Sequence, residues 1–143
     1  MKSDPPTIDV FRGEPGRIRR VEIKIVGGNI RLDFARRDTV VVRAKGDTAT
    51  LGATATAHGD VLRIGSSSAL RYFRQKGRID LVLDLPEETA VDIKVFGADI
   101  VVNGGTGPLT VDGFAGAIEG TSHSDKVRVK FKVGSNDLVQ QAR

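Results

Sequence analysis

Apolar and polar residues alternate along much of the chain with a period of two. Apolar residues take every second position in 21–25, 30–34, 40–44, 51–55, 62–64 and 79–85. Side chains of a β-strand point alternately to its two faces, so this pattern predicts strands that are buried on one face. No window of about 11 residues has the 3.6-residue period of a helix. We therefore expect an all-β protein.

Two glycines, Gly27 and Gly28, separate the first two of these strands. Glycine tolerates the positive φ angles that a two-residue turn requires. The spacing therefore predicts a hairpin between 21–25 and 30–34. The strand over 79–85 ends at Pro86, because proline has no amide hydrogen to donate to a ladder.

A nine-residue spacing appears in the second half of the chain. Five apolar residues stand nine positions apart: Val91, Ile100, Leu109, Ile118 and Val127. Two positions after each lie Ile93, Val102, Val111, Gly120 and Val129, of which only Gly120 lacks an apolar side chain. A strand and turn of nine residues, stacked on its own copies, is the sequence form of a β-solenoid, and two or three units would complete one coil. We expect a single-stranded β-solenoid with stacked short strands, and an antiparallel β-sandwich is the alternative that the first half favours.

The length of 143 residues fits one domain, and we expect residues 1–143 to form a single β domain. Residues 1–17 are expected to cap one end, and residues 135–143 to form a C-terminal tail. Residues 65–77 interrupt the strands and are expected to be an insertion, with a short helix over 69–76. Insertions on regular β scaffolds are common places for function.

The composition excludes several kinds of chemistry. The chain has no cysteine, which excludes disulfides, thiolate metal sites and cysteine nucleophiles, and it has two histidines. Its glycine-rich stretch 104–107 resembles a calcium-binding repeat but has Leu109 where that repeat needs an aspartate. We expect no metal and no cofactor, and a binding or assembly scaffold rather than an enzyme.

Charge is distributed unevenly along the sequence. Residues 1–78 hold 16 Lys and Arg against 8 Asp and Glu, whereas residues 79–143 hold 6 against 10. This asymmetry predicts either a half that binds polyanions or a head-to-tail contact between molecules. Solenoid ends also leave strand edges unpaired, so we expect a homo-oligomer. A protein or polysaccharide partner is open as well.

The candidate site for polyanions or a partner combines arginines with adjacent aromatic residues. Its members are Arg36, Arg37, Arg71, Tyr72, Phe73, Arg74, Lys76 and Arg78. Aromatic rings beside arginines stack bases and neutralise phosphates in single-strand binders, so nucleic-acid binding is the alternative function. We favour a different role for the insertion, in which Tyr72 and Phe73 cover an open sheet edge.

Targeting signals are not apparent. No apolar run reaches the ~18–20 residues that a membrane span requires, and the first residues lack the apolar stretch of a secretory leader. The sequence as it stands predicts a cytoplasmic protein, and a surface or secreted location stays open if a leader or anchor was removed.

Several segments resemble the putative-adhesin domain, a bacterial and archaeal family of unknown biochemical function. Residues 79–86 followed by 91–95 are similar to its passage of a strand, a leucine-proline pair and short repeats. Residues 97–102 and 107–111 resemble its glycine-led rungs, and the resemblance extends over roughly 18–133. It implies a β-solenoid and an adhesin-like binding role, and it supplies no catalytic residue. The chain departs from the family at Gly120, and the expected lack of a leader or membrane segment would be a second departure.

Overall fold

The chain folds into β-strands throughout the part that the computed structural model describes, which is residues 7–46, 53–66 and 79–141. The strands are β1 (Thr7–Arg12), β2 (Arg20–Val26), β3 (Asn29–Ala35), β4 (Val41–Gly46), β5 (Ala53–His58), β6 (Val61–Ser66), β7 (Ile79–Pro86), β8 (Ala90–Phe96), β9 (Ala98–Asn103), β10 (Leu109–Ser122) and β11 (Val127–Gln140). Within these ranges there is no helix, and the predicted all-β class is confirmed.

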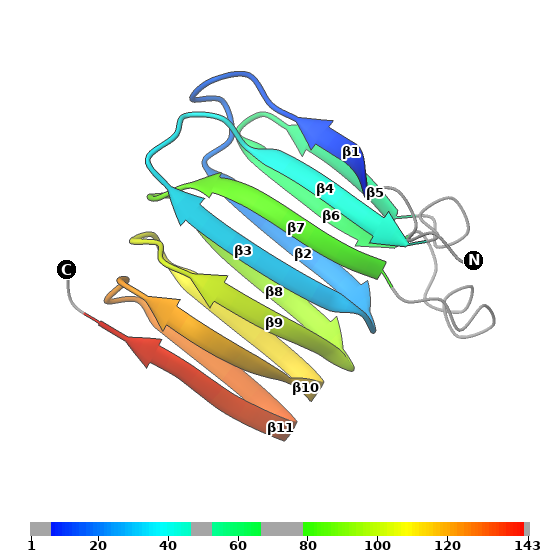
Figure 1. Cartoon of the computed structure of the whole chain (residues 1–143), viewed down its shortest axis with the longest axis vertical. Coiled ribbons are helices and arrows are strands. Elements are labelled where there is room, and N and C mark those ends of the chain that lie inside the picture. The colour runs from blue at the N-terminus through cyan, green and yellow to red at the C-terminus, as the bar shows by residue number, and fades with distance from the viewer. Residues whose placement is uncertain (1–6, 47–52, 67–78, 142–143) are drawn as a thin grey trace, which may run out of the picture.

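The strands lie in two layers, which we name after one strand of each (Figure 1). The β2 layer has the order β5-β6-β2-β8, followed by the first halves of β10 and β11. The β3 layer has the order β1-β4-β7-β3-β9, followed by their second halves. The arrows of β2 and β8 run opposite to those of β3 and β9, so the chain crosses from one layer to the other and returns.

The nine-residue spacing corresponds to this crossing. Leu109 aligns with Val91 and Val127 in the β2 layer, and Ile118 aligns with Ile100 in the β3 layer. Nine residues therefore carry the chain into the opposite layer, and eighteen bring it back beside the strand it left. All of these pairs are parallel.

The predicted hairpin at Gly27 and Gly28 is wrong. β2 pairs in parallel with β6 and β8, and β3 with β7 and β9. Both glycines do have positive φ, 73° and 90°, but they turn the chain between layers. The amide of Gly27 donates a hydrogen bond to the carbonyl of Phe96 at 2.8 Å. This bond joins the turn after β2 to the turn after β8. Alternation shows which face of a strand is buried and does not determine its partner strand.

The core lies between the layers and consists of aligned apolar rows. In the β2 layer one row joins Leu62, Val21, Val91 and Leu109, and in the β3 layer another joins Leu83, Leu32 and Val102; all are at most 2% exposed. A fully buried side chain of this size contributes roughly 1.5–3 kcal/mol to stability. The rows continue from strand to strand, so each strand is stabilised by the strand on either side.

The end of the stack that holds β1 and β5 is built differently. β1 pairs with β4, β4 with β7, and β5 with β6, all antiparallel. One parallel coil pattern therefore does not describe the whole chain, and the strand order is mixed. β1 also lies against β5 across the layers.

The predicted terminal segments and insertion are only partly described. Residues 7–12 of the expected N-terminal cap form β1 on the edge of β4. Residues 135–140, expected as a tail, continue β11 in register with β10. They contain few apolar residues, so alternation does not indicate this strand, which is stabilised by backbone pairing with β10. Gly65 and Ser66 end β6, and the rest of the insertion, including the predicted helix over 69–76, lies outside the described residues.

Gly120, the one position without an apolar side chain in its predicted row, is required by close packing of the backbone. Its φ is +118°, and a Cβ atom there would overlap the carbonyl oxygen of Val102. Gly59 also has positive φ, +63°, but a Cβ atom there would contact nothing within 4 Å. Gly59 therefore has a positive φ without a clash, whereas Gly120 has both a positive φ and a clash.

We predict that Gly120→Ala lowers the free energy of unfolding by about 3 kcal/mol or more, because the substitution adds a clash to the strain. Gly59→Ala should cost only about 1–2 kcal/mol, the cost of a left-handed conformation. Guanidinium denaturation of both variants beside the parent measures the difference. Equal losses would show that Gly120 does not approach Val102 as described.

Candidate functional site

Of the predicted site residues, the structure describes Arg36 and Arg37. Both follow β3 at the end of the β3 layer, and both are exposed. Arg37 Nη1 lies 3.9 Å from Asp84 Oδ1, so its charge is partly neutralised. Arg71, Tyr72, Phe73, Arg74, Lys76 and Arg78 lie outside the described residues. The predicted grouping of these eight residues therefore stays a prediction.

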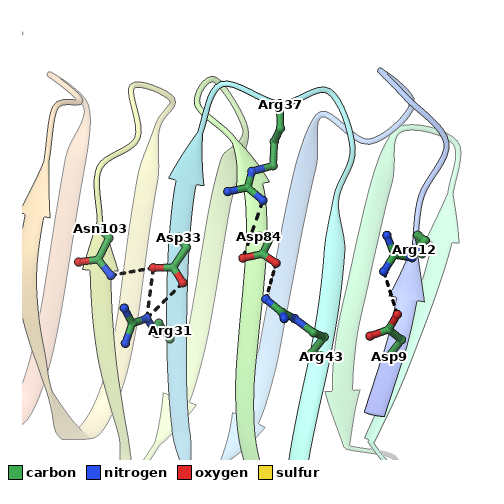
Figure 2. A network of polar contacts seen from close by, with 8 residues as sticks. All are labelled: Asp9, Arg12, Arg31, Asp33, Arg37, Arg43, Asp84 and Asn103. Carbon is green, nitrogen blue, oxygen red and sulfur yellow. Dashed lines mark hydrogen bonds and ion pairs between the residues drawn. The ribbon is translucent and has the colours of Figure 1, made fainter. Parts of the chain in front are cut away.

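The outer face of the β3 layer carries paired charges (Figure 2). Asp84 on β7 accepts a hydrogen bond from Arg43 on β4 and faces Arg37 on its other side. Asp33 on β3 lies 3.1 Å from Arg31 Nε and accepts from Asn103 Nδ2 at 2.7 Å. These carboxylates are paired with side chains of their own strand, of neighbouring strands and of the segment after β3. The paired charges therefore stabilise the layer and leave little capacity to bind a ligand.

The outer face of the β2 layer is hollowed into a groove of about 630 Å³. It crosses β5, β6, β2, β8 and β10. Its polar lining consists of Glu22, Lys24, Thr56, His58, Arg63, Asp92, Lys94, Thr110 and Asp112. The register places these residues in rows across the strands, with Arg63, Glu22, Asp92 and Thr110 in one row and Lys24, Lys94 and Asp112 in the next.

The two rows differ in their electrostatics. In the first, Glu22 lies 3.1 Å from Arg63 Nε and 3.4 Å from Arg20 Nε, and Arg20 also pairs with Asp92. In the second, Lys24 and Lys94 have no ion-pair partner among the described residues. The first row is thus internally neutralised, whereas the second offers two ammonium groups to a ligand.

A second hollow of about 470 Å³ continues the groove. It shares Lys24, Lys94 and Asp112 with the first and adds Lys132, Phe96 and Phe114. The two phenyl rings stack with centroids 5.1 Å apart and planes 8° from parallel. They are 45% and 48% exposed, so a charged groove ends against an exposed apolar pair.

The sequence analysis missed Phe96 and Phe114. They stand eighteen residues apart and take equivalent places where the chain crosses between the layers, at the end of β8 and at the bend of β10. The nine-residue spacing was identified from inward-facing apolar residues alone. The same comparison of outward-facing residues eighteen positions apart would have found Phe96 and Phe114.

No metal centre is formed within the described ranges, since no three His, Cys, Asp or Glu side chains come together there. His123 Nδ1 lies 3.0 Å from the carbonyl oxygen of Gln141, and His58 lines the groove from β5. Over residues 7–46, 53–66 and 79–141, no helical segment has the length and hydropathy needed to cross a membrane.

The comparisons with known proteins bear on the fold alone. The chain is similar to the crystal structure of a putative cell adhesion protein from Clostridium sporogenes, with a TM-score of 0.57 and 10% identity over 96% of this chain and 100% of that one. A putative lipid binding protein from Parabacteroides distasonis aligns at a TM-score of 0.37 and 11% identity, over 94% of this chain and 63% of that one. No family model and no curated protein matches the chain. The first likeness shows a shared fold.

We predict that Asp84→Asn lowers stability by about 1–3 kcal/mol, because it leaves two arginines without their carboxylate. Asp84 is 17% exposed, and Arg43 Nε is buried without a partner among the described residues. Asp9→Asn breaks the exposed pair between Asp9 and Arg12 and should cost at most ~1 kcal/mol. Thermal unfolding of both variants tests this, and a loss as large for Asp9 as for Asp84 would contradict it.

Proposed function

We propose that this protein is a non-catalytic binding scaffold of the adhesin type, and that the groove of the β2 layer is its binding surface. The observation that carries the proposal is the second row of the groove, where Lys24 and Lys94 form no ion pair with any described residue and lie beside the exposed Phe96–Phe114 stack. The groove crosses five strands and is open along the sheet, which suits an extended ligand better than a small molecule.

The chemistry of the lining favours an acidic polysaccharide. Ammonium groups pair with carboxylates, and the side chains of Thr110 and Asp112 suit hydroxyl groups. The exposed rings of Phe96 and Phe114 can pack against the apolar faces of sugar rings, because aromatic rings contact flat apolar surfaces favourably.

The ion pairs of two groove carboxylates support binding without catalysis. Glu22 and Asp92 are held by Arg20 and Arg63. A general acid or base must be free to exchange a proton with a substrate, and these two are committed to structural ion pairs. We therefore infer a surface that holds a ligand and leaves it unchanged.

The scaffold of this proposal is a β-solenoid. The parallel pairs of β2, β3 and β8–β11 with their eighteen-residue offset support it, as does the fold shared with a putative cell adhesion protein. The adhesin resemblance of 79–111 points to the same class. The alternative of nucleic-acid binding depends on residues 71–78, which lie outside the described ranges. The binding experiment below therefore includes single-stranded DNA.

We predict that the protein binds polygalacturonate, an acidic sugar polymer, and that Lys24→Gln with Lys94→Gln weakens this binding about tenfold or more. The binding should also weaken as salt is added, because exposed charges are screened. Isothermal titration calorimetry with polygalacturonate, with uncharged dextran and with single-stranded DNA measures the three affinities.

The matched control is Arg17→Gln with Lys126→Gln, which removes the same charge at exposed positions outside the groove. These changes should leave polygalacturonate binding within about twofold of the parent. The proposal fails if polygalacturonate does not bind or if the control loses as much as the groove variant. It also fails if DNA binds as tightly and with the same loss, because charge alone would then explain binding.

A further inference from the structure

The edge of the sheet at β11 is unpaired among the described residues. β11 is 14 residues long and pairs only with β10 there. Its first half ends the β2 layer and its second half ends the β3 layer, as the red strand in Figure 1 shows. Exposed strand edges pair readily with other chains unless they are covered or blocked.

The core is incomplete at this edge. Leu109, Val111 and Ile118 on β10 are at most 2% exposed, whereas Val127, Val129, Phe131 and Leu138 on β11 are only half-buried. Their inner faces have a neighbouring row on one side and none on the other. A further pair of strands placed on β11 would bury these side chains as the interior rows are buried.

The two halves of the edge carry opposite charge. Arg128, Lys130 and Lys132 are exposed on the first half, and Asp137 is exposed on the second, with Glu119 beside it on β10. None of these side chains forms an ion pair within the described part of the chain. Two copies of the β11 edge therefore have complementary charges only if the first half of one lies beside the second half of the other.

The backbone specifies which residues face the edge. Leu109 N donates to Lys126 O at 2.9 Å, and Gln141 N donates to Ser122 O at 2.8 Å. Alternate residues of a strand turn their amide and carbonyl groups to opposite sides. The groups of Val127, Val129 and Phe131 therefore point to the open edge in the first half, and those of Asn136, Leu138 and Gln140 in the second.

We propose that two copies of this chain join along their β11 edges about a twofold axis parallel to the strands. The first half of β11 in each copy lies antiparallel to the second half in the other. The register pairs Val129 with Leu138 of the second copy, two residues whose backbone groups both face the edge. Lys130 then lies opposite Asp137 of the second copy, and the apolar rows continue through the interface.

A dimer that joined like halves would be disfavoured. It would place Lys130 opposite Lys130 and Arg128 opposite Lys132 along the same antiparallel ladder, and like charges directly opposite destabilise a sheet. Stacking β11 onto the β1 and β5 end of a second copy would leave free edges at both ends and give open filaments. The twofold arrangement of opposite halves closes at two copies.

Sedimentation equilibrium of the full chain tests this arrangement through exchanged charges. The parent should be a dimer at tens of micromolar. Lys130→Asp and Asp137→Lys should each raise the dissociation constant about tenfold or more, because each places like charges together at two symmetric sites. The double variant restores opposite charges and should return the constant to within about threefold of the parent.

The controls are Arg17→Asp and Asp99→Lys, which make the same charge changes on exposed residues of the turn before β2 and of β9, away from the edge. Both should dimerise like the parent, and circular dichroism should show every variant folded. A monomer at all concentrations, a double variant as weak as the single ones, or species that grow beyond a dimer would each overturn the proposal.

Discussion

The in-register stacking of apolar side chains between parallel strands is the constraint on which the rest of the structure depends. An offset of eighteen residues brings Val91, Leu109 and Val127 side by side in one layer, and the intervening nine residues carry the same pattern into the other layer. A slip of one residue would turn every buried side chain outward. The corners must therefore coincide as well, which is why Gly27 bonds to Phe96. The strands are packed so closely that Gly120, within β10, has no room for a side chain beside Val102 of β9.

The same register arranges the outer surface. Because inner residues align, outer residues align too, and this places Arg63 beside Glu22, Lys24 beside Lys94, and Phe96 beside Phe114. The groove and its charges are thus consequences of core packing. β11 follows the same eighteen-residue offset but has a neighbouring strand on one side only among the described residues. Its inner side chains are therefore half-buried, and the opposite charges of its two halves lie in different layers.

Much of the core could be predicted from alternation, because alternation reports burial directly. Ile23, Leu32 and Leu83 were expected inside and are at most 2% exposed. Partner strands could not be predicted in this way, since pairing depends on contacts distant in sequence. The Gly27–Gly28 turn satisfies a hairpin and a crossing equally well, and only the rows of β6 and β8 on either side of β2 decide between them.

The candidate groove was beyond the sequence analysis for a related reason. Its residues come from five strands, and Lys24 and Lys94 are seventy positions apart yet adjacent in the sheet. Arg36 and Arg37 were grouped with the basic residues of 71–78 from the sequence alone, and the structure places them at the end of the other layer, where Arg37 faces Asp84. In a stacked sheet, charged residues cluster with residues aligned on neighbouring strands, and not with their neighbours in the sequence.

The most direct test of this account uses engineered cysteine pairs, which the absence of native cysteine makes unambiguous. Thr110→Cys with Arg128→Cys places two thiols on aligned residues of β10 and β11, within reach of a disulfide. Lys24→Cys with Arg31→Cys places them where a hairpin at Gly27 and Gly28 would align them, although here they lie on outer faces of opposite layers. After mild oxidation of the folded protein, thiol titration and mass spectrometry should find the first pair joined and the second pair free. A disulfide between positions 24 and 31, with free thiols at 110 and 128, would contradict the eighteen-residue parallel stack.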